Sequence, residues 1–310
     1  MTTYRRDIMN LFRPEMKGPV TGDFVERFDT LLDRCGIPRD GPDPAAEPAP
    51  AVVVILDVPA DGSAATATAT AAAAAPVAPA APAGRLDVAG LRQRLGLATG
   101  GGFDKAARAA LFARLSNTQA PALTEDDFQR VADELGVAPS IIKAVRKVEA
   151  PRGPFDDQGR PSILYEKHVF ARNTVPKGKF NASNPVLSAA SWQPGTYGAF
   201  SAQYGKLADA CALDPEAALR ACSWGAFQVL GENAASIGYA STFEMALALT
   251  ESEAAHLECF VRFIRSKGLI TALKAAKPGN AASCVAFVKG YNGNGYAQNQ
   301  YHIKLAQAAL

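Results

Sequence analysis

The sequence has few of the side chains from which metal centres are built. Its 310 residues include only three histidines, His168, His256 and His302, and none of them stands in an HExxH motif or at another ligand spacing. Zinc sites draw on several histidine, cysteine or carboxylate ligands at characteristic spacings. We therefore expect no catalytic metal.

Cysteines are also scarce and irregularly placed. There are five of them, an odd number without a CxxC pair: Cys35, Cys211, Cys222, Cys259 and Cys284. This pattern does not suit a disulfide framework, and free cysteines are among the most buried residue types. The sequence predicts reduced, mostly buried thiols. The alternative is a single disulfide, such as one between Cys211 and Cys222.

Long apolar runs and an excess of charge of one sign are missing as well. The longest aliphatic run, Ala51 to Val58, is too short to span a bilayer or to form the core of a signal peptide. The 32 basic and 30 acidic residues leave a net charge of +2, without a basic cluster. We therefore expect no nucleic-acid partner, no stable membrane insertion, and synthesis in the cytoplasm.

The N-terminal part of the chain divides into two segments. Residues 1–41 carry a short apolar pattern at helix spacing that ends at Gly36-Ile37-Pro38, which predicts a small helical module. Residues 42–85 are rich in alanine and proline, and residues 63–84 contain almost only alanine, threonine and proline. Such a stretch has too few large apolar side chains to offset the entropy of ordering it, so it is interpreted as a linker.

Residues 86–118 have the pattern of two short helices joined by a glycine-rich turn. A helix that ends in Leu-Gly-Leu is followed by Gly100-Gly101-Gly102, and a second helix carries Ala107, Leu111 and Leu115 on one face. This order resembles the repeat of peptidoglycan-binding domains that stand beside cell-wall hydrolases. The resemblance implies a wall-binding module. The alternative is a plain helical hairpin that packs on the next domain.

Two further helices are predicted after this module. Thr124 and Asp127 form a capping box that begins one helix, and Gly136 ends it. Pro139 occupies the first turn of the second helix, where its missing N–H costs nothing. Pro151 disfavours helical geometry beyond residue 150.

Glu149 stands on the apolar face of the second helix. At 100° per residue it falls in the same arc as Ile142 and Val145, and it lies in the last turn. Burial and the helix dipole both disfavour its charged form and raise its pKa, as a general acid requires. The alternative is an ion pair with Arg146 or Arg152.

Two downstream motifs favour the acid. They are Ser-Trp-Gly-Ala-Phe-Gln-Val-Leu at 223–230 and Gly-Tyr-Asn-Gly-Asn-Gly-Tyr at 290–296. With a glutamate that ends a helix, they resemble the signature elements of the lysozyme superfamily, which includes goose-type lysozymes and lytic transglycosylases. The resemblance implies that the first motif lines the floor of a substrate cleft and that the second closes over Glu149.

The sequence is more closely similar to the N-acetylmuramidases of phage and prophage endolysins. The matching segments are Ala-Val-Arg-Lys-Val-Glu at 144–149, the block at 159–170 and the two motifs above, and together they extend over nearly all of residues 123–310. One departure is Ala150 to Phe155, where the family pattern is Glu-Ser-x-Gly-x-Gly-Phe. Ala150 stands where the family has serine, so we expect a backbone contact beside the acid to differ.

This resemblance implies a mainly α, lysozyme-like domain with a small lobe of strands and loops. It implies hydrolysis of the β-1,4 bond between N-acetylmuramic acid and N-acetylglucosamine in peptidoglycan, without a metal or an organic cofactor. Glu149 would protonate the glycosidic oxygen. Residues of the motifs would bind sugar and orient the acid: Ser223, Gln228, Tyr291 and Asn292.

Glu166 is the candidate for a second catalytic carboxylate. It follows the strand-like segment Ser162 to Tyr165, and His168 lies two residues further, on the same face if the strand continues. We expect the two side chains to share a hydrogen bond, with Glu166 holding the attacking water and His168 contacting substrate. The alternative is a salt-bridged wall of the cleft.

Other residues are weaker candidates. Asp156 and Asp157 could act as a general base, although aspartates in loops commonly form turns. Four aromatic residues could stack on sugar rings or pack in the core: Trp192, Tyr197, Phe200 and Tyr204. Thr250 with Glu253 predicts the start of a helix with a buried apolar stripe, to which we assign no chemical role.

Two other activities are compatible with the same motifs. A lytic transglycosylase would leave 1,6-anhydro-muramic ends, and a non-catalytic protein would grip the wall without cutting it. We expect a monomer that binds glycan strands. A phage endolysin released by a holin would be made in the host cytoplasm and act at the cell wall, and a prophage enzyme or a secreted effector would have the same sequence features.

Overall fold

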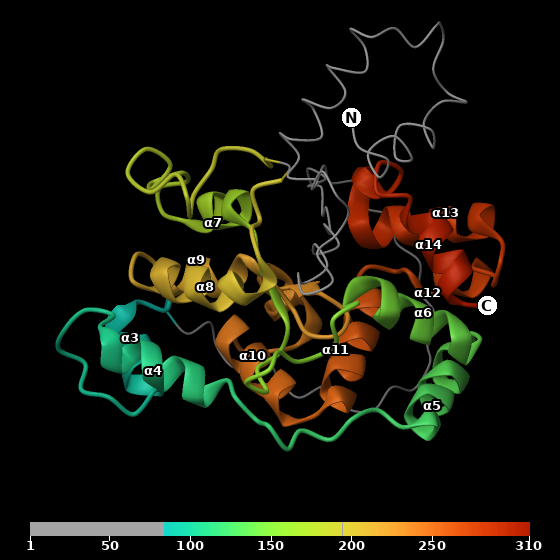
Figure 1. Cartoon of the computed structure of the whole chain (residues 1–310), viewed down its shortest axis with the longest axis horizontal. Coiled ribbons are helices and arrows are strands. Elements are labelled where there is room, and N and C mark those ends of the chain that lie inside the picture. The colour runs from blue at the N-terminus through green and yellow to red at the C-terminus, as the bar shows by residue number, and fades with distance from the viewer. Residues whose placement is uncertain (1–83, 194) are drawn as a thin grey trace, which may run out of the picture. The chain divides into compact units, whose positions relative to one another are not determined.

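The computed structural model describes residues 84–193 and 195–310 (Figure 1). The predicted helical module at 1–41, residues 42–83 of the predicted linker, and Cys35 lie outside the described residues. All of the described residues belong to one compact unit of the chain. In this part of the chain, none of the helices has the length and apolar composition that a membrane span needs.

Helices make up most of the described chain. The α-helices are α3 (Val88–Arg94), α4 (Lys105–Arg114), α5 (Glu125–Leu135), α6 (Pro139–Glu149), α7 (Lys167–Asn173), α8 (Gln203–Cys211), α9 (Pro215–Arg220), α10 (Thr242–Glu251), α11 (Glu253–Ser266), α12 (Ile270–Ala275), α13 (Ala281–Asn292) and α14 (Tyr301–Ala308). Short 3-10 turns are η2 (Phe200–Ala202), η3 (Gly231–Asn233), η4 (Ala235–Ile237) and η5 (Gly293–Tyr296).

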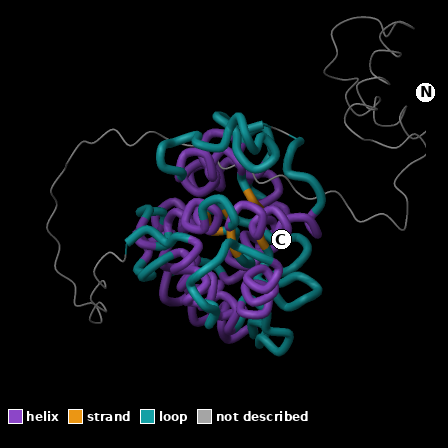
Figure 2. Tube along the Cα trace, turned by 90° about the vertical axis from the view of Figure 1, so that its left-hand side faces the viewer, coloured by secondary structure: helices purple, strands orange, loops and turns teal. Residues whose placement is uncertain are grey.

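A small antiparallel sheet stands among these helices (Figure 2). Its order is β1 (Ile163–Tyr165), β2 (Cys222–Trp224) and β3 (Val229–Leu230). Ser223 of β2 is the partner of both Leu164 of β1 and Leu230 of β3. All three strands are buried, because helices cover the sheet. The predicted mainly α fold with a small strand lobe is confirmed.

Local sequence signals explain the two helices that lead to Glu149. The Thr124 hydroxyl accepts from the Asp127 amide, the Asp127 carboxylate accepts from the Thr124 amide, and Gly136 ends α5 in the left-handed region. Pro139 begins α6. The predicted capping box, glycine end and proline start are therefore confirmed. The buried faces of α5 and α6 pack against each other and so fix the direction of α6.

The predicted wall-binding segment shares a core with the domain that follows it. Leu91 of α3 and Leu111 and Leu115 at the end of α4 are wholly buried in the same cluster as the side chains of α5 to α14. On the surface, Arg108 of α4 forms an ion pair of 2.6 Å with Asp209 of α8. The function of this segment stays a prediction.

The four described cysteines are free and buried, so the prediction of reduced, buried thiols is confirmed for them. The alternative disulfide between Cys211 and Cys222 is not formed. Another expectation was wrong: the helix predicted to begin at Thr250 has Ser252 as its N-cap, and Thr250 lies inside α10. The Ser252 hydroxyl accepts from the Ala255 amide, and its extended backbone separates α10 from α11.

Candidate active site

Glu149 lies at the end of α6 with its side chain turned into the protein. Ile141, Ile142 and Val145 bury the same face of the helix, and Glu149 itself is only 3% exposed. The helix stops at residue 150, ahead of Pro151, as predicted. The sequence therefore places a carboxyl in the last turn of a buried helix, where both the surroundings and the dipole disfavour a negative charge.

The partner of the Glu149 carboxyl is an amide and not a cation. Asn292, the last residue of α13, donates from Nδ2 to Glu149 Oε1 at 3.2 Å. Arg146 pairs with Glu253 instead, and the guanidinium of Arg152 lies 5.3 Å from the centre of the Phe200 ring. The ion pair considered as the alternative for Glu149 is thus not the arrangement that the structure contains.

The second oxygen of the carboxyl has no hydrogen bond within the described residues. Glu149 Oε2, Asn292 Oδ1 and the Tyr301 hydroxyl are all buried without a partner of good geometry. Tyr301 belongs to α14, which packs along α6. The Asn292 and Tyr301 side chains, from α13 and α14, thus lie beside the Glu149 carboxyl and leave hydrogen-bonding capacity around it unused.

Burial decides the proton affinity of this group. It raises the pKa of Glu149 from 4.5 to about 7, while the neighbouring Tyr301 and Asn292 side chains act in the opposite direction. A carboxyl with a pKa near 7 keeps its proton in a large fraction of molecules at neutral pH. It can therefore donate that proton to a leaving oxygen.

A cavity of about 30 Å³ adjoins Glu149. This volume holds one or two water molecules and is much smaller than a sugar ring. Its walls come from the end of α6, the β2–β3 turn, η3, α11 and α13: Glu149, Gln228, Val229, Leu230, Asn233, Phe263, Tyr291 and Asn292. Three predicted site residues, Gln228, Tyr291 and Asn292, therefore surround the predicted acid.

The turn from Gly225 to Gln228 presents one wall of the cavity. Gln228 has a positive φ of 46°, a conformation that non-glycine residues adopt uncommonly. Its Nε2 donates to the carbonyls of Gly225 at 2.9 Å and Ser162 at 3.3 Å. The Tyr291 hydroxyl donates to the Phe227 carbonyl at 2.5 Å. These bonds hold the turn against β1 and α13.

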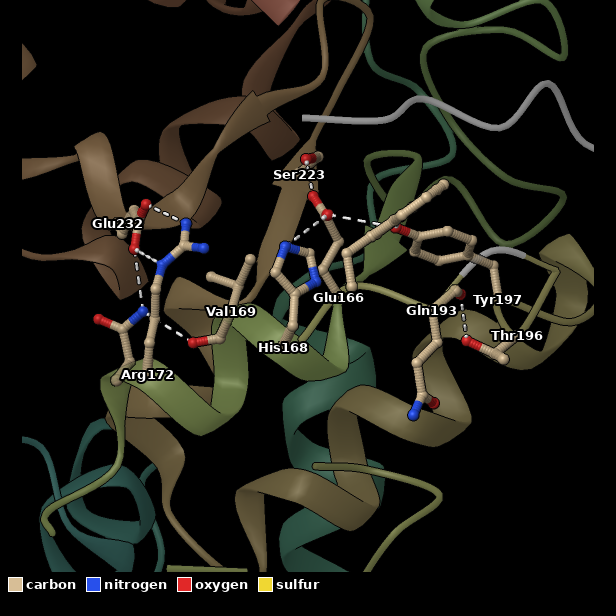
Figure 3. A network of polar contacts seen from close by, with 11 residues as sticks. Glu166, His168, Val169, Arg172, Gln193, Thr196, Tyr197, Ser223 and Glu232 are labelled. Carbon is tan, nitrogen blue, oxygen red and sulfur yellow. Dashed lines mark hydrogen bonds and ion pairs between the residues drawn. The ribbon is translucent and has the colours of Figure 1, made fainter. Parts of the chain in front are cut away.

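Glu166 lies in a separate polar cluster, drawn in Figure 3. It is 0% exposed, accepts from the Ser223 hydroxyl at 3.2 Å and the Tyr197 hydroxyl at 3.4 Å, and lies 3.8 Å from His168 Nε2. Burial raises its pKa to about 8, against the effects of Ser223, Arg172 and Tyr197. Its carboxyl is not among the groups that line the cavity beside Glu149.

His168 lies near Glu166 as predicted, but at 3.8 Å from the carboxyl it does not form the expected hydrogen bond, and the reason given for the contact was wrong. The strand ends at Tyr165, and Glu166 is the N-cap of α7, so that His168 lies in the first turn of a helix. Glu166 keeps an extended backbone at the helix start, and its amide bonds to the Ala221 carbonyl at 2.9 Å. The short strand therefore delivers Glu166 to Ser223, and the first turn of α7 brings His168 to the same carboxyl.

The weaker candidates fall into different places. Asp156 accepts from the backbone of Gln158 and Arg160 and pairs with the Arg160 guanidinium at 2.6 Å, so it forms a turn. Asp157 is exposed, and neither aspartate lines the cavity. Tyr204 is a core residue whose hydroxyl bonds to the Pro161 carbonyl.

Two of the aromatic candidates remain partly exposed. Trp192 and Phe200 are half-buried, and the Trp192 indole donates to the Tyr197 hydroxyl at 2.7 Å. Trp192 is thereby joined through Tyr197 to Glu166.

Sequence reasoning missed Tyr301 at the acid, because nothing in the pattern of the terminal helix separates it from ordinary core residues.

The chain was compared with known proteins. A family model described as Muramidase, N-acetylmuramidase, matches residues 138–310. Among solved structures, an endolysin of Burkholderia AP3 phage is 32% identical in sequence, with a TM-score of 0.53. The match covers 73% of this chain and 95% of that one. No curated protein matches the chain.

Proposed function

The chain belongs to the N-acetylmuramidase family of phage endolysins and is a peptidoglycan hydrolase, and from this we propose that it hydrolyses the β-1,4 bond between N-acetylmuramic acid and N-acetylglucosamine. The observation that carries the proposal is the buried Glu149 carboxyl, with its raised pKa and its unpartnered oxygen beside a polar cavity. Cleavage of a glycosidic bond needs a protonated carboxyl beside the leaving oxygen.

Glu149 acts as the general acid. Its protonated carboxyl donates to the glycosidic oxygen as the bond to the sugar carbon breaks, and its charge is then stabilised by the Asn292 amide at 3.2 Å. Gln228, Tyr291 and Asn292 position the sugar and the acid.

Glu166 acts as the second carboxylate and holds the attacking water. Three groups that can donate a hydrogen bond reach its carboxyl, from Ser223, Tyr197 and His168, and they are the partners that an ionised carboxylate needs. His168 and Ser223 support Glu166 and border the substrate. Because Glu166 is 0% exposed, this role requires a movement that opens its carboxyl to water.

The remaining proposals concern the setting of the enzyme. The protein acts as a monomer on glycan strands, is made in the host cytoplasm, and reaches the wall after a holin opens the membrane. The segment at 86–118 adds contacts to the wall. These proposals are supported by the likeness to a phage endolysin.

Mass spectrometry of digested peptidoglycan tests the proposed reaction. The hydrolase should release fragments with reducing N-acetylmuramic acid ends that have gained one water. Anhydro-muramic ends would identify a lytic transglycosylase, and reducing N-acetylglucosamine ends would identify a glucosaminidase. Binding to walls without any cleavage would identify a non-catalytic wall-binding protein.

A further inference from the structure

One buried histidine, His256 of α11, contacts the turn that carries Gln228. His256 is 1% exposed. Its Nδ1 accepts a hydrogen bond from the Ala226 amide at 2.9 Å, and its Nε2 donates to the Leu249 carbonyl at 2.6 Å. Since an amide N–H can only donate, the ring must be neutral, with its proton on Nε2.

The surroundings keep the ring in that form. Burial lowers the pKa of His256 from 6.5 to about 4. The Phe155 ring packs against it with centroids 4.8 Å apart. On the other side, a Cβ at Gly225 would lie 2.8 Å from His256 Nδ1, and Gly225 has a positive φ of 71°. Only glycine at 225 allows the turn to approach the ring so closely.

Helix α11 also fixes the helix that carries the acid. Glu253, in its first turn, pairs with Arg146, which precedes Glu149 by three residues on α6. Further along α11, the Phe260 ring stacks on Phe227 with centroids 4.6 Å apart. One helix therefore holds both sides of the cavity, the acid through Glu253 and the Gln228 turn through His256.

We propose that His256 is a positioning residue for catalysis, which sets the turn at Gly225–Gln228 through its bond to the Ala226 amide and so places Gln228 beside Glu149. This inference rests on the proposed muramidase function. It replaces the expectation that α11 is plain core without a chemical role. Without the acceptor at Nδ1, the Ala226 amide would be buried without a partner, and the turn would shift to find one.

Two variants separate this role from simple packing. Asn Oδ1 takes the place of His Nδ1, so His256→Asn keeps an acceptor for the Ala226 amide. Gln Nε2 takes the place of His Nε2, so His256→Gln keeps the donor to Leu249 and loses the acceptor. Both variants lose the ring contact with Phe155 equally.

The experiment measures kcat and KM of the full-length variants on peptidoglycan, with melting temperatures as the check on folding. His256→Gln should lower kcat by about 10- to 100-fold with KM little changed, because a shift of about 1 Å at a site is that costly. His256→Asn should keep a kcat about tenfold or more above that of His256→Gln. Leu111→Ala in α4 is the control that loses stability away from the site.

Equal loss of kcat in the two variants, or loss that only follows melting temperature, would overturn the proposal. If both variants fail to fold, ¹⁵N NMR of the wild-type imidazole decides: the neutral ring with its proton on Nε2 supports the assignment at pH 6, and an imidazolium or a proton on Nδ1 contradicts it. Wild-type digests that lack reducing muramic ends would instead refute the proposed function.

Discussion

At the scale of single residues, the balance between desolvation and hydrogen bonding sets the chemistry of Glu149. The rise of its pKa from 4.5 to about 7 corresponds to about 3 kcal/mol in favour of the protonated form. A single hydrogen bond to a carboxylate stabilises the charged form by roughly 1.5–3 kcal/mol. The Asn292 bond therefore reduces the effect of burial without cancelling it. A carboxyl in this position is ready to give up a proton near neutral pH.

These pKa values predict a bell-shaped dependence of activity on pH. In the proposed mechanism Glu149, with a pKa of about 7, acts in its protonated form, and Glu166, with a pKa of about 8, acts in its ionised form. The rate depends on molecules in which Glu149 is protonated and Glu166 is ionised at the same time, and this form is most populated between pH 7 and 8. Below pH 7 its population falls because ever less Glu166 is ionised. Above pH 8 it falls because ever less Glu149 is protonated. Initial rates of wall digestion from pH 5 to 10 measure the profile. A rate that is flat from pH 5 to 7 would contradict the role of Glu166.

Asn292→Leu should extend the alkaline side of this profile. The change removes the amide that donates to Glu149 at 3.2 Å and so raises the pKa of that carboxyl further. The decline should then begin at a higher pH than in the wild type. Gln129→Leu on the exposed face of α5 serves as the control. An unchanged or lower alkaline limit would mean that Asn292 does not tune the acid.

Glu166→Gln tests the second carboxylate. If Glu166 holds and activates the water, kcat should fall by about 100-fold or more, since general-base catalysis contributes at least that factor in most enzymes. Glu134→Gln is the control, because Glu134 is a paired carboxyl on the exposed side of α5. Wild-type kcat in Glu166→Gln would show that the carboxyl only supports the fold.

Single residues also show what sequence alone could predict. Glu149 was predictable, because helix spacing and Pro151 fix both its face and its place in the last turn. The environment of Glu166 was predictable only in part, since the strand ends one residue before it. Tyr301 and His256 could not be predicted as neighbours of the site, because each reaches it through contacts with segments distant in sequence.

At the scale of elements, the boundaries of α5 and α6 were predicted correctly and the start of α11 was not. The capping box and Gly136 of α5 act locally and are legible in the sequence. The break between α10 and α11 depends on the extended backbone of Ser252, next to Glu253, whose amide bonds to the Pro121 carbonyl at 2.9 Å. That bond joins residues 132 positions apart, so local pattern does not reveal it.

The cap of α5 should contribute to stability and not to chemistry. Thr124→Ala removes the hydroxyl that accepts from the Asp127 amide, which should lower the free energy of unfolding by about 1 kcal/mol. Because the buried faces of α5 and α6 still pack together, kcat should stay unchanged. Urea denaturation and wall digestion measure the two quantities. Thr118→Ala, at an exposed position outside any helix, is the control.

At the scale of the whole molecule, a single hydrophobic core contains residues from both sides of the domain boundary that the sequence suggested near residue 120. Leu86, Leu91, Leu111 and Leu115 are buried in the cluster that also holds the apolar side chains of α6 and α13. Burial of four leucines contributes roughly 6–12 kcal/mol. This is comparable to the entire stability of a typical domain. The segment at 86–118 is therefore part of the folded enzyme, whatever it binds.

Truncation tests this conclusion. A fragment of residues 84–310 should fold and keep the kcat of the full chain, since it contains the whole described core. A fragment of residues 119–310 should fail to fold cooperatively, because it exposes the surface that the four leucines cover. Circular dichroism and thermal melting compare the two fragments. Cooperative melting of 119–310 near the temperature of 84–310 would show that the first two helices are a separate module.

The most direct test of the account is the rate at which Glu149→Gln clears a suspension of purified peptidoglycan. The glutamine side chain has the size and polarity of the protonated acid, but it carries no acidic proton that it could donate to the leaving oxygen. The rate should fall by about 100-fold or more while the variant still folds and sediments with the wall. Glu251→Gln, at an exposed carboxyl, should clear the suspension as the wild type does. Clearing by Glu149→Gln at the wild-type rate would contradict the assignment of Glu149 as the general acid.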